Sequence, residues 1–263
     1  MLAQCLTLVE DGASTASPLL LIHALGTESS IWDQVIPGLA AKTRVIRIDL
    51  PGHGRSPPSR DPYSLDNLIR AILDRVDAIG VRRFAIGGVS VGGIIAQAMA
   101  IRYHERVTHL VLSNTAAKIG SWETWSARYR QVSERGLSAL APQLARRWVS
   151  ADFAKQQPKV VEHLIARLAV ISVPGYLHAA LLLRDSDFRS ELSMIACPTL
   201  IIHGEKDPVI SLEEARALRQ GIRHSRLAVL NCAHLACLEQ PTEFVDHVSN
   251  FLGSFAYSSD SVR

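Results

Sequence analysis

Residues 87–93 read "GGVSVGG", and this stretch decides the fold. It follows the apolar, strand-like run "RRFAI" and precedes the helix-like run "IIAQAMAIRY". The segment Gly88 to Gly92 fits the pattern G-x-S-x-G, in which small residues let a strand and a helix meet in a sharp turn around a serine. The alternative is an ordinary glycine-rich turn. With a strand before it and a helix after it, the pattern favours Ser90 as an exposed nucleophile.

A serine nucleophile needs a base, and the base needs an acid to orient it. In this kind of turn-centred site the acid and the histidine follow the serine along the chain, each after a later strand. Asp207 in "EKDPV" follows the apolar run "PTLIIHG", and His234 in "CAHLA" follows "SRLAVLN". His53 lies in a turn-rich loop and His203 inside an expected strand. We therefore predict the triad Ser90, Asp207 and His234.

Acyl transfer also requires donors for the oxyanion. The residue after the nucleophile supplies one backbone N–H, which is that of Val91. The loop after the run "PLLLI" supplies the other, and in "HALGT" this is the N–H of Leu25. Gly26 would keep that loop close to the serine. Serine in the nucleophile position indicates esters, thioesters, lactones or amides as substrates.

Strand-like runs alternate with helix-like segments along most of the chain. Helical periodicity is clear at 64–80 and 211–221, and each of these segments ends at a glycine. The apolar runs are continuous rather than alternating, as in parallel strands that are buried on both faces. The expected class is α/β, with an open, mostly parallel sheet covered by helices on both faces. Six runs are expected to form its strands: 18–24, 43–50, 82–88, 107–114, 198–204 and 225–231.

The alternation stops between residues 117 and 190, where helical periodicity continues without a convincing strand. A structureless loop of that length is uncommon in a compact domain. We predict a helical cap at 117–190 inserted into a core formed by 1–116 and 191–263. The region from Thr115 to Ser190 carries eleven lysines and arginines against six acids. This excess indicates either a solvated helical surface or a basic cover over an anionic substrate.

Composition excludes several classes of function. The net charge is only +3, so nucleic acid is not an expected partner. No apolar run approaches the roughly 18 residues of a membrane helix, and the N-terminus does not resemble a signal peptide. We expect a cytoplasmic protein with no membrane partner. Cys232 and Cys237 flank His234, but their spacing matches no familiar zinc pattern, so no metal site is expected.

Four motifs resemble the α/β-hydrolase family across nearly the whole chain: "DLPGHGRS" at 49–56, "GVSVGG" at 88–93, "GEKDPV" at 204–209 and "HLACLEQP" at 234–241. Others resemble more narrowly the 3-oxoadipate enol-lactonases. These are "LGTESSIWDQ" at 25–34, "PYSLDNL" at 62–68, "LVLSNTAAKIG" at 110–120, Trp125 with Arg128, Gly175 with Tyr176, and "LRDSDFR" at 183–189.

The resemblance implies a serine hydrolase that opens an enol-lactone through an acyl-enzyme, without metal or organic cofactor. The implied substrate is a five-membered enol-lactone with an acetate arm, from the β-ketoadipate branch of aromatic degradation. More broadly, the expected partner is a small anionic lactone or ester. Arginine and lysine can bind the carboxylate of that arm. The candidates in the cap are Lys118, Arg128 and Arg184, with Trp125 as an apolar wall. A monomer or a homodimer is expected.

The sequence departs from the lactonase pattern at three places in the expected pocket wall. "LIHALG" at 21–26 has histidine and alanine where small polar residues are usual, Val91 replaces a methionine, and "HLAC" at 234–237 replaces a more polar ending. Another carboxylesterase, lactonase or C–C bond hydrolase is therefore the alternative. A non-catalytic ligand-binding relative is a third possibility, although such proteins often lose the triad that this chain retains.

Overall fold

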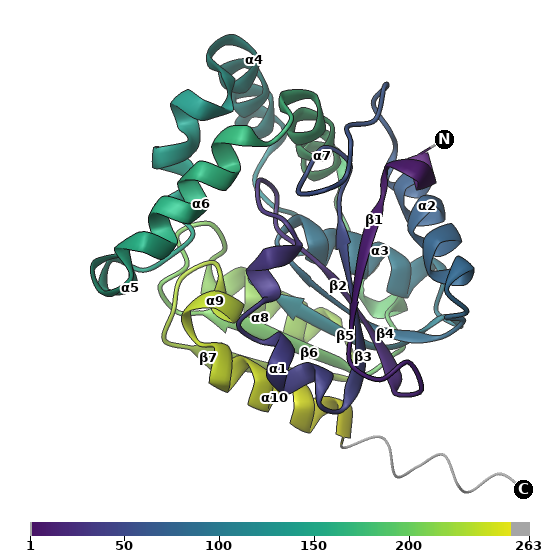
Figure 1. Ribbon diagram of the computed structural model, residues 1–263. Helices are drawn as coiled ribbons and strands as arrows, with labels where there is room; N and C mark the ends of the chain where they lie inside the picture. Colours follow the sequence, from purple (N-terminus) through teal and green to yellow (C-terminus); the bar gives the residue numbers. More distant parts are fainter. Residues whose placement is uncertain (1, 254–263) are drawn as a thin grey trace, which may run out of the picture.

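The computed structural model describes residues 2–253, which form a seven-stranded sheet between layers of helices (Figure 1). The strand order is β1-β3-β2-β4-β5-β6-β7; β1 is antiparallel to β3, and every other neighbouring pair is parallel. The predicted α/β class with a mostly parallel sheet is confirmed. The strands are β1 (Thr7–Asp11), β2 (Ser17–Ile22), β3 (Thr43–Asp49), β4 (Phe84–Val89), β5 (Val107–Ser113), β6 (Thr199–Gly204) and β7 (Ser225–Leu230).

The sequence did not predict β1. Its residues are all at least partly accessible to solvent, because it is an edge strand that pairs only with β3. Its sequence "TLVED" lacks the continuous apolar run by which the other strands were recognised.

The parallel register brings the carboxyl ends of the central strands to one edge of the sheet. Val89 of β4 pairs with Ser113 of β5, and Ser113 pairs with Ile202 of β6. Residues that directly follow these strands therefore meet above the same edge. This is the usual place for a ligand site in an open α/β sheet.

Helices α2 and α3 cover one face of the sheet, and α1 and α10 cover the other (Figure 1). Every residue of α3 from Val91 to Ile101 is buried, since this helix runs through the middle of the molecule. Helix α2 instead buries one apolar stripe, and the Ser64 side chain caps its N-terminus by accepting from the Asn67 N–H. The core helices are α1 (Ile36–Ala40), α2 (Leu65–Ala78), α3 (Val91–Arg102), α8 (Leu212–Gly221), α9 (Ala236–Glu239) and α10 (Pro241–Gly253), with short 3₁₀ turns at Leu2–Cys5, Ser29–Trp32 and Leu192–Met194.

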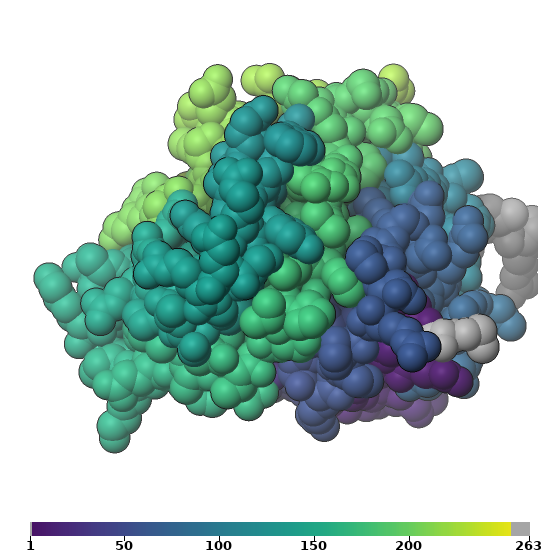
Figure 2. All heavy atoms as spheres, turned by 90° about the horizontal axis from the view of Figure 1, so that it is seen from above, coloured from purple at the N-terminus to yellow at the C-terminus, as the bar shows by residue number. Residues whose placement is uncertain are grey.

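Four helices lie between β5 and β6 in the sequence, within the segment predicted to form the cap. Figure 2 looks down on this segment, which is teal and green and covers much of that side of the molecule. Its backbone is joined to the core by Ser172 N–H donating to Gly52 O (3.1 Å) and Leu235 N–H donating to Trp148 O (2.9 Å). The helices are α4 (Trp122–Ala145), α5 (Ala151–Gln156), α6 (Pro158–Val170) and α7 (Val173–Asp185). Of the predicted core segment 191–263, residues 254–263 lie outside the described part of the chain.

Between residues 2 and 253, no single helix is both long enough and apolar enough to cross a membrane. Helices α6 and α7 reach the required length and composition only as a pair, which bends by 98° at the break between them.

Candidate active site

Ser90 is the single residue between β4 and α3, and its backbone has a conformation that few residues adopt. Its φ and ψ are 56° and −116°, in a region that costs energy for any side chain. The Ser90 N–H donates to Ser113 O (3.2 Å), and Thr115 Oγ1 donates to Ser90 O (2.9 Å). These bonds hold the strained turn in place and leave the Ser90 hydroxyl at the carboxyl edge of the sheet.

The glycines around Ser90 are required by contact with backbone. A Cβ on Gly88 would lie 2.2 Å from the carbonyl group of Gly92, and a Cβ on Gly92 would lie 2.2 Å from Ile22 O. Neither neighbour is a flexible side chain that could move aside. The glycine pattern seen in the sequence is therefore the condition for bringing β2, β4 and α3 together at the serine.

Asp207 and His234, which follow β6 and β7, meet in a buried ion-pair geometry. His234 Nδ1 lies 2.8 Å from Asp207 Oδ2, and both side chains are almost completely buried. Burial acts to raise the pKa of Asp207, but the His234 imidazole and several hydrogen bonds outweigh it, so the pKa lies below its ordinary value. The aspartate is therefore ionised at neutral pH and holds the imidazole through Nδ1, so Nε2 is the ring nitrogen that Asp207 does not engage.

Asn114 is part of this arrangement, and the sequence analysis did not single it out. Its Nδ2 donates both to Asp207 Oδ2 (3.0 Å) and to Ala233 O (3.0 Å). Val209 N–H donates to the other carboxylate oxygen at 2.8 Å. Asn114 directly follows β5 and has a φ of 46°, a left-handed conformation that asparagine tolerates better than most residues. Its position, as a polar residue directly after an expected strand, is the feature of the sequence that could have indicated a role in the site.

The backbone N–H groups of the two predicted oxyanion donors, Leu25 and Val91, are not taken up by the helices and strands of residues 2–253. Val91 is the first residue of α3, where a backbone N–H has no partner within the helix. In the described part of the chain the Leu25 N–H also donates to no acceptor. Leu25 and Ser90 line the same cavity.

Two buried histidines hold the loop that carries Leu25. His23 Nδ1 lies 2.8 Å from Ala24 O, and its Nε2 accepts from Leu50 N–H (2.9 Å). His53 Nε2 accepts from Gly26 N–H (3.3 Å), and its Nδ1 lies 3.2 Å from Pro51 O. Each ring thus donates through one nitrogen and accepts through the other, which only a neutral imidazole can do.

Burial lowers the pKa of both histidines, that of His53 to about 3. The unfolded chain takes up protons at these residues near the ordinary pKa of about 6.5, whereas the folded chain does not. Their contribution to stability is complete above about pH 6.5 and is lost as the pH falls toward 3. We expect the free energy of unfolding to fall by up to about 1.4 kcal/mol per pH unit for each histidine below pH 6.

Urea unfolding between pH 7.5 and 4.5 measures this dependence. His53→Asn should flatten the slope relative to wild type, because the titrating ring is gone. His104→Asn, at a histidine whose side chain is 70% exposed, should leave the slope unchanged. Equal slopes in wild type and His53→Asn would contradict the assignment of a buried neutral ring.

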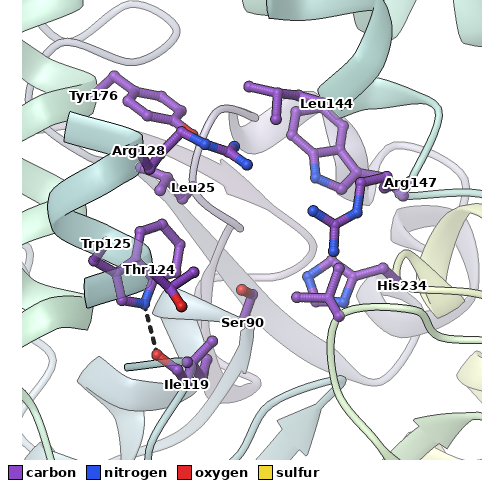
Figure 3. A pocket seen from close by; sticks show the side chains of 13 residues that line it. Leu25, Ser90, Ile119, Thr124, Trp125, Arg128, Leu144, Arg147, Tyr176 and His234 are labelled. Carbon is purple, nitrogen blue, oxygen red and sulfur yellow. Dashed lines mark hydrogen bonds between the residues drawn. The ribbon is translucent and has the colours of Figure 1, made fainter. Parts of the chain in front are cut away.

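A cavity of about 150 Å³ lies above Ser90, between the core and the helices α4 and α7 (Figure 3). No aspartate or glutamate of the described chain is among the residues that line it, whereas two arginines are. Its walls are otherwise largely apolar. The lining residues are Leu25, Ser90, Ile119, Gly120, Thr124, Trp125, Arg128, Leu144, Arg147, Trp148, Tyr176, Val209 and His234.

Of the four substrate-binding candidates, Trp125 and Arg128 line this cavity. Trp125 Nε1 donates to Ile119 O (2.6 Å), which presents the indole ring as a wall, and Arg128 lies beside the Tyr176 hydroxyl. Burial raises the pKa of Tyr176, and the nearby Arg128 only partly offsets this.

Lys118 and Arg184 do not line the cavity. Lys118 Nζ pairs with Asp187 (3.3 Å), and Arg184 Nε pairs with Asp185 (2.6 Å) while its guanidinium lies 5.9 Å from the centre of the Trp122 ring. The structure therefore does not bring these two residues to the cavity, and neighbouring acids pair with both charges.

Arg147 is a charged residue of the cavity lining that was not predicted from the sequence. It lies just beyond the end of α4 next to a second arginine, Arg146. Both arginines are exposed, but only Arg147 lines the cavity. Helical spacing alone could not say which of the two faces the site.

The cysteines near His234 are buried thiols. Burial raises the pKa of both Cys232 and Cys237, that of Cys237 to about 12. Within residues 2–253 no three histidine, cysteine or acidic side chains are grouped closely enough to hold a metal ion.

The known proteins that this chain resembles include three enol-lactonases. The chain is 36% identical over 233 residues to 3-oxoadipate enol-lactonase 2 of Acinetobacter baylyi, covering 89% of this chain and 87% of the relative. It is 31% identical to 3-oxoadipate enol-lactonase 1 of the same organism, covering 93% and 91%. The crystal structure of the enol-lactonase from Burkholderia xenovorans LB400 superposes with a TM-score of 0.91 at 31% identity, covering 94% and 96% of the two chains.

The model of the family described as the alpha/beta hydrolase fold matches residues 17–241, which include the turn at Ser90 as well as Asp207 and His234. The resemblance indicated by the sequence motifs is thereby confirmed. The chain is an enzyme of the α/β-hydrolase family.

Proposed function

We propose that this protein opens 3-oxoadipate enol-lactone to 3-oxoadipate through an acyl-enzyme on Ser90. The observation that carries the proposal is the cavity above Ser90, which two arginines line and no acid of the described residues does. A cavity of this charge favours an anionic ester or lactone. The enol-lactonases among its relatives support the choice of lactone.

In the first half of the reaction, His234 Nε2 takes the proton from the Ser90 hydroxyl as its oxygen bonds to the lactone carbonyl carbon. The N–H groups of Leu25 and Val91 bind the oxyanion that forms. Asp207, ionised and 2.8 Å from His234 Nδ1, stabilises the imidazolium. The ring C–O bond then breaks, and the enolate leaves with the proton that His234 returns.

In the second half, His234 accepts a proton from water while the water oxygen bonds to the acyl carbon. The bond to the Ser90 oxygen breaks, and Ser90 regains its proton from His234. The released acid ionises, and the enol rearranges to the ketone. The proposed first half is helped by the leaving group, because an enolate is a better leaving group than the alkoxide of an ordinary ester.

The test compares anionic and neutral substrates under the same conditions. We expect kcat/KM for 3-oxoadipate enol-lactone to exceed that for p-nitrophenyl acetate and butyrate by at least about 100-fold, roughly the value of one or two charge-assisted hydrogen bonds. The lactone can be generated in situ and its loss followed by ultraviolet absorbance.

The rival activity is a neutral-ester hydrolase with the same triad. If the short p-nitrophenyl esters are the better substrates by a wide margin, the lactone proposal fails and the rival is favoured. Raising the salt concentration provides a control, because it should weaken turnover of the anion and leave the neutral esters nearly unchanged.

A further inference from the structure

Two guanidinium groups approach the cavity from opposite sides. Figure 3 shows Arg128 on the side of Leu25 and Tyr176, and Arg147 on the side of His234, with both side chains directed into the space above Ser90. In the described chain neither arginine forms an ion pair with a carboxylate. Two like charges that line one small cavity repel each other, and an anion bound between them relieves that repulsion.

The segment that carries Arg147 is joined to the core on the side of His234, and the Arg147 side chain itself is exposed. Arg147 Nη2 reaches Pro208 O at 3.5 Å, and Pro208 directly follows Asp207. The next residue, Trp148, accepts a hydrogen bond through its backbone oxygen from Leu235 N–H at 2.9 Å, and Leu235 directly follows His234. The segment that carries Arg147 is therefore docked on the two loops that carry the acid and the base.

The side of the cavity on which each arginine lies matters, because the acyl group and the leaving group of an ester lie on opposite sides of the bond that breaks. The carbonyl oxygen points to the oxyanion donors, Leu25 and Val91. The leaving oxygen must lie near His234, which protonates it. A group attached to the leaving-oxygen side of the ester is therefore brought toward Arg147, whereas Arg128 lies beside the oxyanion loop at Leu25.

In 3-oxoadipate enol-lactone the acetate arm is bonded to the carbon that carries the ring oxygen, which is the leaving oxygen. We propose that Arg147 binds the carboxylate on the leaving-group side of the scissile bond and so selects substrates that carry their charge there. This inference rests on the proposed roles of Ser90 and His234. Arg128 is left to contact the acyl side, where hydrolysis creates a second carboxylate.

Two isomeric anions test the proposal, since they differ only in which side of the ester carries the charge. In 3-acetoxypropanoate the carboxylate is on the alcohol, at the same distance from the ester oxygen as in the lactone. In monomethyl succinate it is on the acyl group. The neutral amides 3-acetoxypropanamide and methyl succinamate have nearly the same shapes, and hydrolysis of all four can be followed by pH-stat titration.

We expect Arg147→Gln to lower kcat/KM for 3-acetoxypropanoate by about 10- to 100-fold, the range for a lost hydrogen-bonded charge pair. The neutral amide 3-acetoxypropanamide and the isomer monomethyl succinate should change less than about threefold. Arg147→Lys should restore part of the loss, because it keeps the charge but not the planar fork. Arg146→Gln is the matched control at the adjacent, exposed arginine and should leave all four substrates unchanged.

Equal losses on 3-acetoxypropanoate and its amide would overturn the proposal, as would a loss confined to monomethyl succinate. A second measurement needs no turnover. Calorimetry can measure the binding of 3-acetoxypropanoate to the inactive variant Ser90→Ala. Binding should become about tenfold weaker when Arg147→Gln is added and should not change when Arg146→Gln is added. Equal binding to all three variants would also overturn the proposal. If wild type discriminates between the esters as expected but leaves the enol-lactone intact, the proposed function fails while the assignment of Arg147 stands.

Discussion

Replacing Ser90 with alanine is expected to lower kcat/KM by about 10⁶-fold, to the level that binding and the oxyanion donors alone provide. In the proposed mechanism the Ser90 hydroxyl oxygen forms the acyl-enzyme, and between residues 2 and 253 no other serine or threonine has a positive φ. Alanine keeps the small volume and the same left-handed conformation. The loss should therefore appear in kcat with little effect on folding.

Two measurements separate loss of the nucleophile from loss of structure. Thermal unfolding of Ser90→Ala should remain within a few degrees of wild type. A fluorophosphonate should label wild type and the surface control Ser138→Ala, at an exposed serine of α4, but not Ser90→Ala. Labelling that persists in Ser90→Ala would place the nucleophile elsewhere.

Replacing Asp207 with asparagine is expected to lower kcat by about 10⁴-fold. The carboxylate now accepts from Val209 N–H at one oxygen and from Asn114 and His234 at the other. An amide has only one acceptor oxygen. In either orientation the asparagine NH₂ group therefore faces a hydrogen-bond donor. If the asparagine oxygen accepts from Val209 N–H, the NH₂ group faces the Asn114 amide and His234 Nδ1, and His234 is forced into the wrong tautomer.

A matched aspartate shows whether charge alone explains this loss. Asp187 also has a pKa below its ordinary value, chiefly because it accepts from the Arg189 guanidinium, but it lies in an exposed ion-pair cluster. Asp187→Asn should change kcat less than about twofold. Steady-state kinetics on p-nitrophenyl acetate measure both variants, and a small effect of Asp207→Asn would contradict its role in orienting His234.

The fold could be predicted well from the sequence wherever burial or close packing restricts which residues can stand at consecutive positions. Buried parallel strands produce continuous apolar runs, and the turn at Ser90 admits only glycine at positions where a Cβ would meet backbone. These constraints are visible in any sequence that satisfies them. Strand β1 was missed because an edge strand with partly accessible side chains leaves no such pattern.

The charged residues of the cap show where sequence patterns stop being informative. Lys118, Arg184 and Arg147 are all basic residues in or next to helices, but only Arg147 reaches the cavity. Lys118 and Arg184 are held by Asp187 and Asp185. Which charge is neutralised depends on how α4 and α7 pack on the core, and this packing is set by contacts between residues far apart in the chain.

The central claim is that the anionic lactone is the substrate of Ser90, and the most direct test is hydrolysis of 3-oxoadipate enol-lactone by wild type and Ser90→Ala in parallel. The account predicts rapid loss of the lactone with stoichiometric 3-oxoadipate for wild type, and a rate about 10⁶-fold lower for Ser90→Ala. The claim would be contradicted if folded wild type is labelled at Ser90 by a fluorophosphonate but hydrolyses the lactone no faster than buffer alone. The search would then turn to other esters.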